Sequence, residues 1–172
     1  MPTRKPSRVR PAARIDRVRP GLRHATGADW RTLVAHRRGM FAEIGGRTPR
    51  QLTAHDAVYR KWIMPRLASG EILVLVVETT DRRVVASGGI WFRPEQPRPG
   101  SPQLEVPYLF SMFTEPTYRH RGLARRIVRE ALRTCRARGY TRVVLHAAPR
   151  GRPLYRGLGF ERTWEMRSIL RP

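Results

Sequence analysis

The chain has 172 residues, 40% of them hydrophobic, which suffices for one domain with a buried core and lies above the range of disordered proteins. Basic residues outnumber acidic ones 35 to 13, and the formal net charge of +22 favours anionic partners such as nucleotide cofactors or nucleic acids. The single Cys135 excludes an internal disulfide framework and a four-cysteine metal site, and the longest apolar run, 72–77, is too short to span a membrane.

Residues 1–20 contain seven basic residues, one acidic residue and four prolines, a composition that predicts a solvated N-terminal extension. A tether to nucleic acid or to a membrane surface is the alternative for this segment. The segment lacks the apolar stretch of a secretory signal, so we expect a soluble, cytoplasmic protein without membrane attachment. The chain is therefore divided into an extension, 1–20, and one globular domain, 21–172.

The globular domain is predicted to begin with a short strand at 22–26 and a helix at 28–43. Apolar side chains recur at helical spacing in this helix, and Gly45 and Gly46 end it. The residues on this spacing are Leu33, Val34, Arg37, Met40, Phe41 and Ile44.

A second helix is predicted to begin at Thr53, where Asp56 follows three residues later as at a capped N-terminus. Pro65 predicts a kink or break, because proline removes a backbone donor inside a helix. The helix is expected to end at Gly70.

Three strands are predicted over 71–79, 84–92 and 103–116. The first is almost continuously apolar, as expected for a strand that is covered on both faces. Gly88 and Gly89 in the second strand indicate a bulge or a close backbone approach, and Pro107 in the third requires an irregularity. Residues 93–102, with four prolines and a glycine, are predicted to form a loop.

The last third of the chain predicts a helix that ends at Gly139, a strand at 141–147, a short helix at 152–157 and a final strand or hairpin at 159–171. The buried stripe of the long helix is predicted from Leu123, Ile127, Val128, Ala131, Leu132 and Cys135. The element order is β-αα-βββ-α-β-α-β, which is that of a mixed α/β domain.

The stretch TYRHRGLARRI, 117–127, joins the third long strand to this helix. Burial of an aliphatic side chain stabilises by about 1.5–3 kcal/mol, whereas a charge near a helix start contributes about 0.3–1 kcal/mol, so packing alone explains the apolar spacing. The small residues Gly122 and Ala124 instead leave the unpaired backbone N–H groups of the first turn open to an anion, and Arg119 and Arg121 can add hydrogen bonds. This pattern predicts a phosphate cradle that is neither a P-loop nor a dinucleotide fingerprint.

The segment MFTEPTYRHRGLARRIV resembles the pyrophosphate-binding motif of the GNAT superfamily of N-acetyltransferases, whose core Arg/Gln-x-x-Gly-x-Gly/Ala corresponds here to Arg119–Ala124. The segment VVLHAAPRGRPLYRGLGFERTWEMR resembles the strand, short helix and Leu-Tyr-x-x-x-Gly-Phe ending of the same family. The second match is carried by Leu154, Tyr155, Gly159 and Phe160. The resemblance is specific over 103–170 and implies a mixed, mostly antiparallel twisted sheet flanked by helices.

The resemblance also implies transfer of the acetyl group of acetyl-CoA to a primary amine by direct attack, without a metal. The implied cofactor-binding residues are Met112, Phe113, Thr114, Arg119, His120, Arg121, Gly122, Leu123, Ala124 and Arg125. Tyr155 is the implied general acid for the leaving thiolate, because a phenol pKa of about 10 lies above the value of about 8.5 for a thiol. Without the resemblance, Tyr155 would be interpreted as an aromatic side chain packed beside Phe160.

The general base is left open among several side chains, with a water-relayed base as the alternative. The candidates are Glu105, Tyr108, Glu78, His146 and Glu165, of which Glu105 is the first choice. A covalent route through Cys135 is not expected, because Cys135 lies on the buried stripe.

The acceptor is expected to be a small-molecule amine, neutral or anionic, because 13 acidic residues are few for an acidic cleft. The acceptor site is expected to come from 28–69 and 93–102. The oligomeric state is left open between a monomer and a homodimer. The alternative function is a basic module that keeps this fold and binds nucleic acid or acts in regulation.

Overall fold

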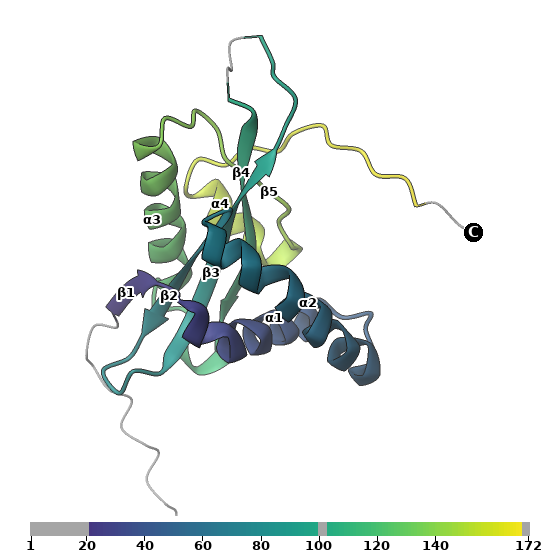
Figure 1. Cartoon of the computed structure of the whole chain (residues 1–172), viewed down its shortest axis with the longest axis vertical. Helices are drawn as coiled ribbons and strands as arrows, with labels where there is room; N and C mark the ends of the chain where they lie inside the picture. The colour runs from purple at the N-terminus through teal and green to yellow at the C-terminus, as the bar shows by residue number, and fades with distance from the viewer. Residues whose placement is uncertain (1–20, 100–102, 170–172) are drawn as a thin grey trace, which may run out of the picture.

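The computed structural model describes residues 21–99 and 103–169, which form a five-stranded sheet with helices on both faces (Figure 1). The strands are β1 (Gly21–His24), β2 (Ile72–Glu78), β3 (Val84–Pro94), β4 (Glu105–Thr114) and β5 (Val144–Leu145). The helices are α1 (Trp30–Ile44), α2 (Pro49–Ser69), α3 (Leu123–Ala137) and α4 (Arg152–Arg156). The predicted extension, 1–20, lies outside the described residues.

The sheet has the spatial order β1-β2-β3-β4-β5. Strands β1 to β4 pair antiparallel with their neighbours, and β4 pairs in parallel with β5. The expected mixed, mostly antiparallel sheet is therefore confirmed, as is the element order from the first strand to the short helix α4.

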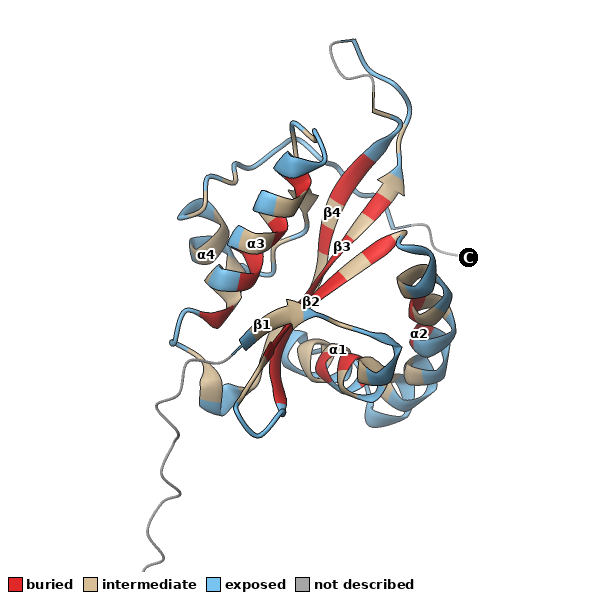
Figure 2. Cartoon of the chain, turned by 60° about the vertical axis from the view of Figure 1, so that its left-hand side comes forward, coloured by how far each residue is buried: buried red, intermediate tan, exposed pale blue. Residues whose placement is uncertain are grey.

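Two apolar cores lie on opposite faces of the sheet, and the central strands β2 and β3 are buried along most of their length (Figure 2). Helices α1 and α2 cover one face, and their core contains Leu33, Val34, Tyr59, Ile63, Ile72, Val74, Val76 and Val84. Helix α3 covers the other face with the predicted residues Leu123, Ile127, Val128, Ala131 and Cys135, while Leu132 is partly buried. Coverage on both faces explains why β2 is apolar along its length.

Helix α2 begins earlier than predicted, at Pro49 rather than Thr53. Thr48 caps it reciprocally with Gln51, since Thr48 Oγ1 accepts from Gln51 N at 3.3 Å and Gln51 Oε1 accepts from Thr48 N at 2.8 Å. A proline at the first helical position strengthens this start. The helix continues through Pro65 to Ser69, so the predicted break does not occur.

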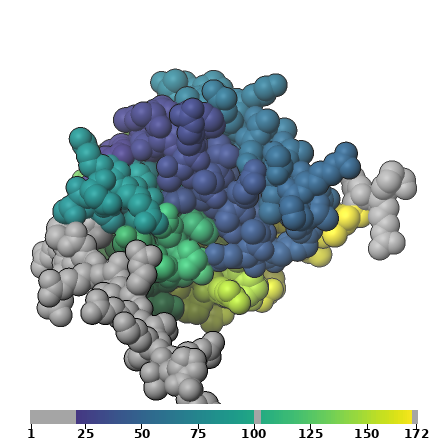
Figure 3. Space-filling view, turned by 90° about the horizontal axis from the view of Figure 1, so that it is seen from below, coloured from purple at the N-terminus to yellow at the C-terminus, as the bar shows by residue number. Residues whose placement is uncertain are grey.

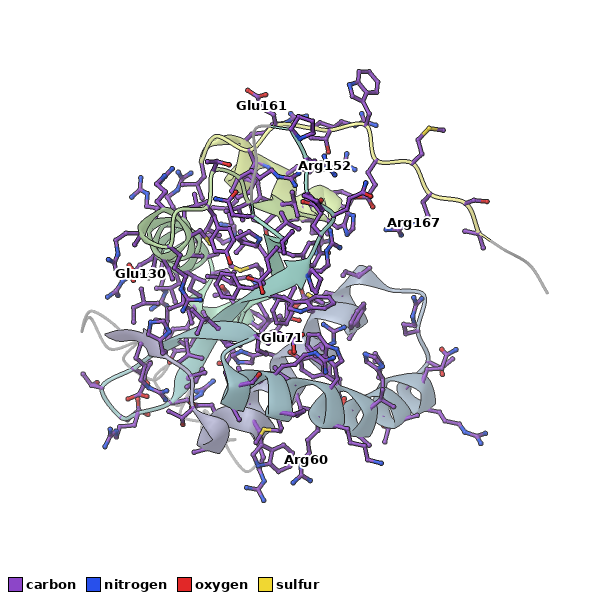
Figure 4. All side chains as sticks on the ribbon, turned by 45° about the horizontal axis from the view of Figure 1, so that its top comes forward. Arg60, Glu71, Glu130, Arg152, Glu161 and Arg167 are labelled. Atoms are coloured by element: carbon purple, nitrogen blue, oxygen red, sulfur yellow. The ribbon has the colours of Figure 1, made fainter. Side chains whose placement is uncertain are left out.

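The C-terminal part of the domain has less regular structure than predicted. Strand β5 consists of two residues instead of seven, and residues 160–169 form neither a helix nor a strand. Figure 4 shows this last segment, with Glu161 and Arg167, leaving the body beyond α4. Trp164 and Met166 are 98% and 94% exposed. Within the described residues, neither strand pairing nor apolar packing therefore stabilises a final strand in this segment.

None of the described helices is long and apolar enough to span a membrane. The cytoplasmic location and the homodimer remain predictions.

Candidate active site

Strand β4 contains a β-bulge where it faces the two glycines of β3. Gly89 pairs with Phe110 and Ser87 with Phe113, so β4 holds one more residue than β3 over this interval. Ser111, in the bulge, has a positive φ of 51°. A Cβ on Gly88 would lie 2.1 Å from Met112 Sδ, which confirms the close approach expected for the glycine pair.

The pairing of β4 with β5 ends before the bulge. Their pairing is limited to Tyr108 with Val144 and Leu109 with Leu145, whereas β4 continues to Thr114. The backbone N–H and C=O groups of residues 111–114 that face the β5 side therefore lack a strand partner among the described residues. Such an edge can pair with an extended chain that carries amides, as pantetheine does.

The loop after β4 and the first turn of α3 form the cradle, residues 119–125. The first intrahelical hydrogen bond runs from Arg126 N to Gly122 O at 3.0 Å, so the three preceding N–H groups have no acceptor within the helix. Gly122 has a φ of 76°, and a Cβ there would meet no protein atom within 4 Å. Free donors beside an open space at a helix start fit a phosphate group.

The arginine side chains of the cradle bind to the protein itself. Arg119 Nε donates to Thr114 O at 2.9 Å, and its guanidinium also pairs with Glu43 at the end of α1. Arg121 donates to Thr117 O at 3.0 Å. Arg125 donates to Gly157 O at 3.1 Å and so connects α3 with the end of α4. An anion in the cradle would therefore meet the backbone N–H groups together with the guanidinium donors that these contacts leave free.

A shallow depression of about 720 Å³ begins at the cradle and extends between β1 and α3. Its lining residues are Leu22, Arg23, His24, Leu75, Gly122, Arg125, Arg126, Arg129, Glu130 and Arg133. None of them belongs to β4 or α4, so this basic surface lies beside the phosphate position and apart from Tyr155.

Tyr155 projects from α4 into a mostly apolar environment. Its ring packs against Phe160, with 5.7 Å between the ring centroids, and partly belongs to the core of α3. Burial, with a smaller effect of Tyr108, raises the pKa of Tyr155 to about 12. The phenol therefore keeps its proton at neutral pH, as a general acid must.

Three candidates for the general base form one hydrogen-bonded chain, which we call the relay. The Tyr108 hydroxyl lies 2.8 Å from His146 Nδ1, and His146 Nε2 lies 2.6 Å from Glu165 Oε1. With Glu165 ionised, Nε2 carries the proton and Nδ1 accepts the hydroxyl of Tyr108. Tyr108 also acts electrostatically on Tyr155, so the relay begins near the candidate acid.

The other candidate bases lie elsewhere. Glu105, at the start of β4, accepts a hydrogen bond from the Tyr140 hydroxyl at 2.7 Å, and six residues of strand, roughly 20 Å, separate it from the Ser111 bulge. Glu78 Oε2 accepts from Arg23 Nε at 2.6 Å on the β1 side of the sheet. The base role of Glu105 remains a prediction that none of these contacts supports.

Cys135 is buried, and burial raises the pKa of its thiol to about 11. A thiolate nucleophile at this position is therefore disfavoured. Within residues 21–99 and 103–169, no group of three or more His, Cys, Asp or Glu side chains is arranged to hold a metal.

Arg37 lies on the inner, mostly apolar stripe of the first helix. Its position in the sequence alone suggested no function. Its Nη1 donates to Ser111 Oγ in the bulge at 2.6 Å, and its guanidinium lies over the rings of Tyr59 and Phe41 at 4.4 and 4.9 Å. A charged residue within an apolar stripe was the signal in the sequence.

Figure 3 shows that the segment around the end of β4 and the cradle, in green, lies between α1 and α2, in purple and blue, and the region of α4, in yellow-green. The cradle and the α4 region therefore adjoin one another, in agreement with the hydrogen bond from Arg125 to Gly157 O.

The sequence profile of the acetyltransferase (GNAT) family matches residues 33–160. A GCN5-related N-acetyltransferase from Ralstonia eutropha JMP134 is 30% identical, with a TM-score of 0.81 over 88% of this chain and 98% of that chain. A predicted acetyltransferase from Clostridium acetobutylicum, whose structure contains acetyl-CoA, is 23% identical, with a TM-score of 0.80 over 88% and 96% of the two chains.

The aminoglycoside 6'-N-acetyltransferase AAC(6')-IG from Acinetobacter haemolyticus is 19% identical, with a TM-score of 0.66 over 88% and 98% of the two chains. A comparison with curated protein sequences found no match.

Proposed function

Because this chain belongs to the acetyltransferase (GNAT) family, we propose that it transfers the acetyl group of acetyl-CoA to a primary amine of a small molecule. The observation that carries the proposal is the continuity of the site. An open edge of β4 leads from the cradle at the start of α3 toward the relay and Tyr155. Acetyl-CoA supplies a thioester whose carbonyl carbon accepts an amine.

The cradle and the β4 edge would hold the cofactor at two places. The N–H groups of Leu123, Ala124 and Arg125 point toward the pyrophosphate position, and Gly122 leaves space for it. The free edge of residues 111–114 pairs with the pantetheine amides, and an N–H group of residues 112–114 stabilises the oxyanion. Holding both reactants in line supplies several kcal/mol of the rate enhancement.

The relay takes the proton of the attacking amine. As Tyr108 accepts this proton, it passes its own to His146 Nδ1, and Glu165 stabilises the resulting imidazolium. Tyr155 donates its proton to the leaving thiolate, and the proton held by His146 returns through solvent to restore Tyr155. Each turnover therefore returns Tyr108, His146 and Tyr155 to their starting protonation states.

A small-molecule acceptor is supported by two observations. A protein with the same fold, the enzyme from Acinetobacter haemolyticus, is by its name an aminoglycoside acetyltransferase. The candidate site contains Arg37 and few carboxylates, since Glu43, beside the cradle, is already paired with Arg119. This charge distribution disfavours a polycationic acceptor such as a histone tail or an aminoglycoside, so the relative supports a small-molecule amine in general and not its own substrate.

The alternative, a nucleic-acid-binding module, is favoured by the basic depression between β1 and α3. However, Arg23 there is paired with Asp29 and Glu78, and Arg133 is paired with Glu130, so part of this charge is already neutralised. Binding to nucleic acid would weaken steeply with salt through counterion release at many phosphates, whereas acetyl-CoA presents few phosphates and its binding depends less on salt.

The test is thermal unfolding with and without acetyl-CoA, followed by a thiol-release assay with a panel of amines. At 100 times the Kd, the cofactor should add about 2.7 kcal/mol to the free energy of unfolding. We expect a clear rise in Tm and amine-dependent release of CoA. No change in Tm at saturating acetyl-CoA, combined with salt-sensitive binding of RNA or DNA, would favour the alternative.

A further inference from the structure

We propose that Arg37 binds a carboxylate of the acceptor, so that the substrates are amino acids or related amines with a carboxylate near the amine. This inference rests on the proposed function, because it names the acceptor class of the same site.

The position of Arg37 follows from the packing of α1 against β4. The side chain leaves the inner face of α1 and reaches the bulge, where Nη1 donates to Ser111 Oγ at 2.6 Å. The Tyr59 hydroxyl of α2 interacts with the same serine. Arg37 is thus fixed beside the strand segment on which the thioester is expected to lie.

The guanidinium of Arg37 lacks an acidic partner. No carboxylate of the described residues lies within 4.0 Å of it, whereas the next residue, Arg38, pairs with Asp56. Its Nε is buried and has no hydrogen-bond partner among the described residues. Burial lowers the pKa of Arg37 from its ordinary value, and the neighbouring Tyr59 and Tyr108 offset part of this effect.

Arg37 is partly buried, and a partly buried charge without a counter-ion is costly, so the folded protein gains from supplying the missing anion. With Nη1 bonded to Ser111 and Nε enclosed by the protein, the Nη2 group is the donor that remains for a carboxylate oxygen. The aromatic walls formed by Phe41 and Tyr59 contribute no further positive charge, so the position matches a single negative charge better than a phosphate dianion.

The location of the anion also determines where the amine lies. Tyr108, the first member of the relay, lies on the same strand as Ser111 and close enough to Arg37 to act on the pKa of its guanidinium. An acceptor whose carboxylate binds Arg37 therefore places a nearby amine toward Tyr108 and the β4 bulge. The structure thus combines a recognition group and a proton acceptor within reach of one small molecule.

The experiment compares matched acceptors in the thiol-release assay. Amino acids are paired with the amines that lack their carboxylate, such as β-alanine with ethylamine, and phosphoethanolamine tests a phosphate in the same role. We expect the wild type to prefer the carboxylate of each pair by at least about tenfold in kcat/KM, the order of one charge-assisted hydrogen bond. Calorimetry with the carboxylate acceptor, in the presence of CoA, measures binding separately from turnover.

Arg37→Met should abolish this preference and the binding of the carboxylate acceptor, while acetyl-CoA still raises Tm as in the wild type. Arg37→Lys keeps the positive charge but lacks the planar guanidinium with its several donors, so it should retain part of the preference. It serves as a second variant if Arg37→Met does not fold. Arg38→Met, which removes the neighbouring surface arginine, should keep the full preference.

If Arg37 were only structural, Arg37→Met would lower Tm without changing the ratio between paired acceptors, and this result would overturn the proposal. A wild type that binds acetyl-CoA but acetylates both members of each pair equally, or prefers phosphoethanolamine, would also overturn it while leaving the acetyltransferase function in place. Absence of an acetyl-CoA-dependent rise in Tm would overturn the proposed function and this inference together.

Discussion

The hydroxyl of Tyr108 lies 2.8 Å from Nδ1 of His146, although 38 residues separate the two in the sequence. The parallel pairing of β4 with β5 explains this contact, because Tyr108 is opposite Val144, two residues before His146. Glu165, 19 residues further along, completes the relay from the C-terminal segment. The short pairing of β4 with β5 thus brings together the first two side chains of the relay.

The role of the relay is tested by His146→Ala. Without the imidazole, Tyr108 has no acceptor for its proton, and we expect kcat to fall by about 10²-fold, the lower end of general-base contributions, with unchanged affinity for acetyl-CoA. Since His146 is exposed, added imidazole should restore part of the rate. His24→Ala on β1 is the matched control. Full activity of His146→Ala in buffer without imidazole would rule out the relay.

Tyr155→Phe tests the general acid. We expect kcat to fall by about 10²-fold, while the Kd of acetyl-CoA measured by calorimetry stays constant, because the ring still packs against Phe160. The raised pKa of about 12 adds a pH prediction. The phenol keeps its proton throughout pH 7–10, so wild-type kcat should not decline from pH 9 to 10 through this group. Unchanged turnover in Tyr155→Phe would contradict the assignment.

The cradle is tested by two glycines that flank α3, one before its start and one after its end. Gly122 and Gly139 both have positive φ angles, 76° and 80°, and a Cβ at either position would meet no protein atom within 4 Å. Gly→Ala should therefore cost about 1–2 kcal/mol of stability at each position. Only Gly122→Ala places a methyl group where a phosphate is expected, and it should weaken acetyl-CoA at least about tenfold, as measured by calorimetry. Equal affinity in the two variants would argue against the cradle.

The sequence predicted those features that depend on local patterns. The stripe from Leu123 to Cys135 predicted the buried face of α3, and Gly88 predicted the close approach between β3 and β4. The start of α2 was predicted incorrectly because the signal at Thr53 and Asp56 was preferred to the reciprocal cap of Thr48 and Gln51.

The candidate site was predictable only in part, for a physical reason. Motifs can indicate the cradle and Tyr155, because backbone geometry and residue spacing are local properties. Side chains from different elements meet only after the sheet forms, so His146 and Glu165 could be named but not connected. Arg37 was visible as a charge on an apolar stripe, yet its lack of an acidic partner is a property of the folded chain.

His36 is a buried histidine on α1 that takes no part in the proposed chemistry. Its Nδ1 lies 2.9 Å from Ser87 Oγ, and its ring packs against Phe113 of β4 at 5.0 Å. Burial, with the nearby charge of Arg83, lowers the pKa of His36 to about 4. Glu115 lies 4.0 Å from Nε2 but is paired with Arg83, so it compensates little of the cost of protonation.

Stability should therefore fall with decreasing pH through this group. Between about pH 6.5 and 4, the unfolded chain binds a proton at His36 and the folded chain does not, so the contribution is complete above pH 6.5 and is lost toward pH 4. The loss amounts to about 3 kcal/mol at one pKa unit per 1.36 kcal/mol. Urea unfolding at pH 7 and pH 4.5 should show that His36→Gln has a smaller pH dependence than the wild type, whereas exposed His55→Gln does not. An identical slope in His36→Gln would mean that His36 titrates normally in the fold.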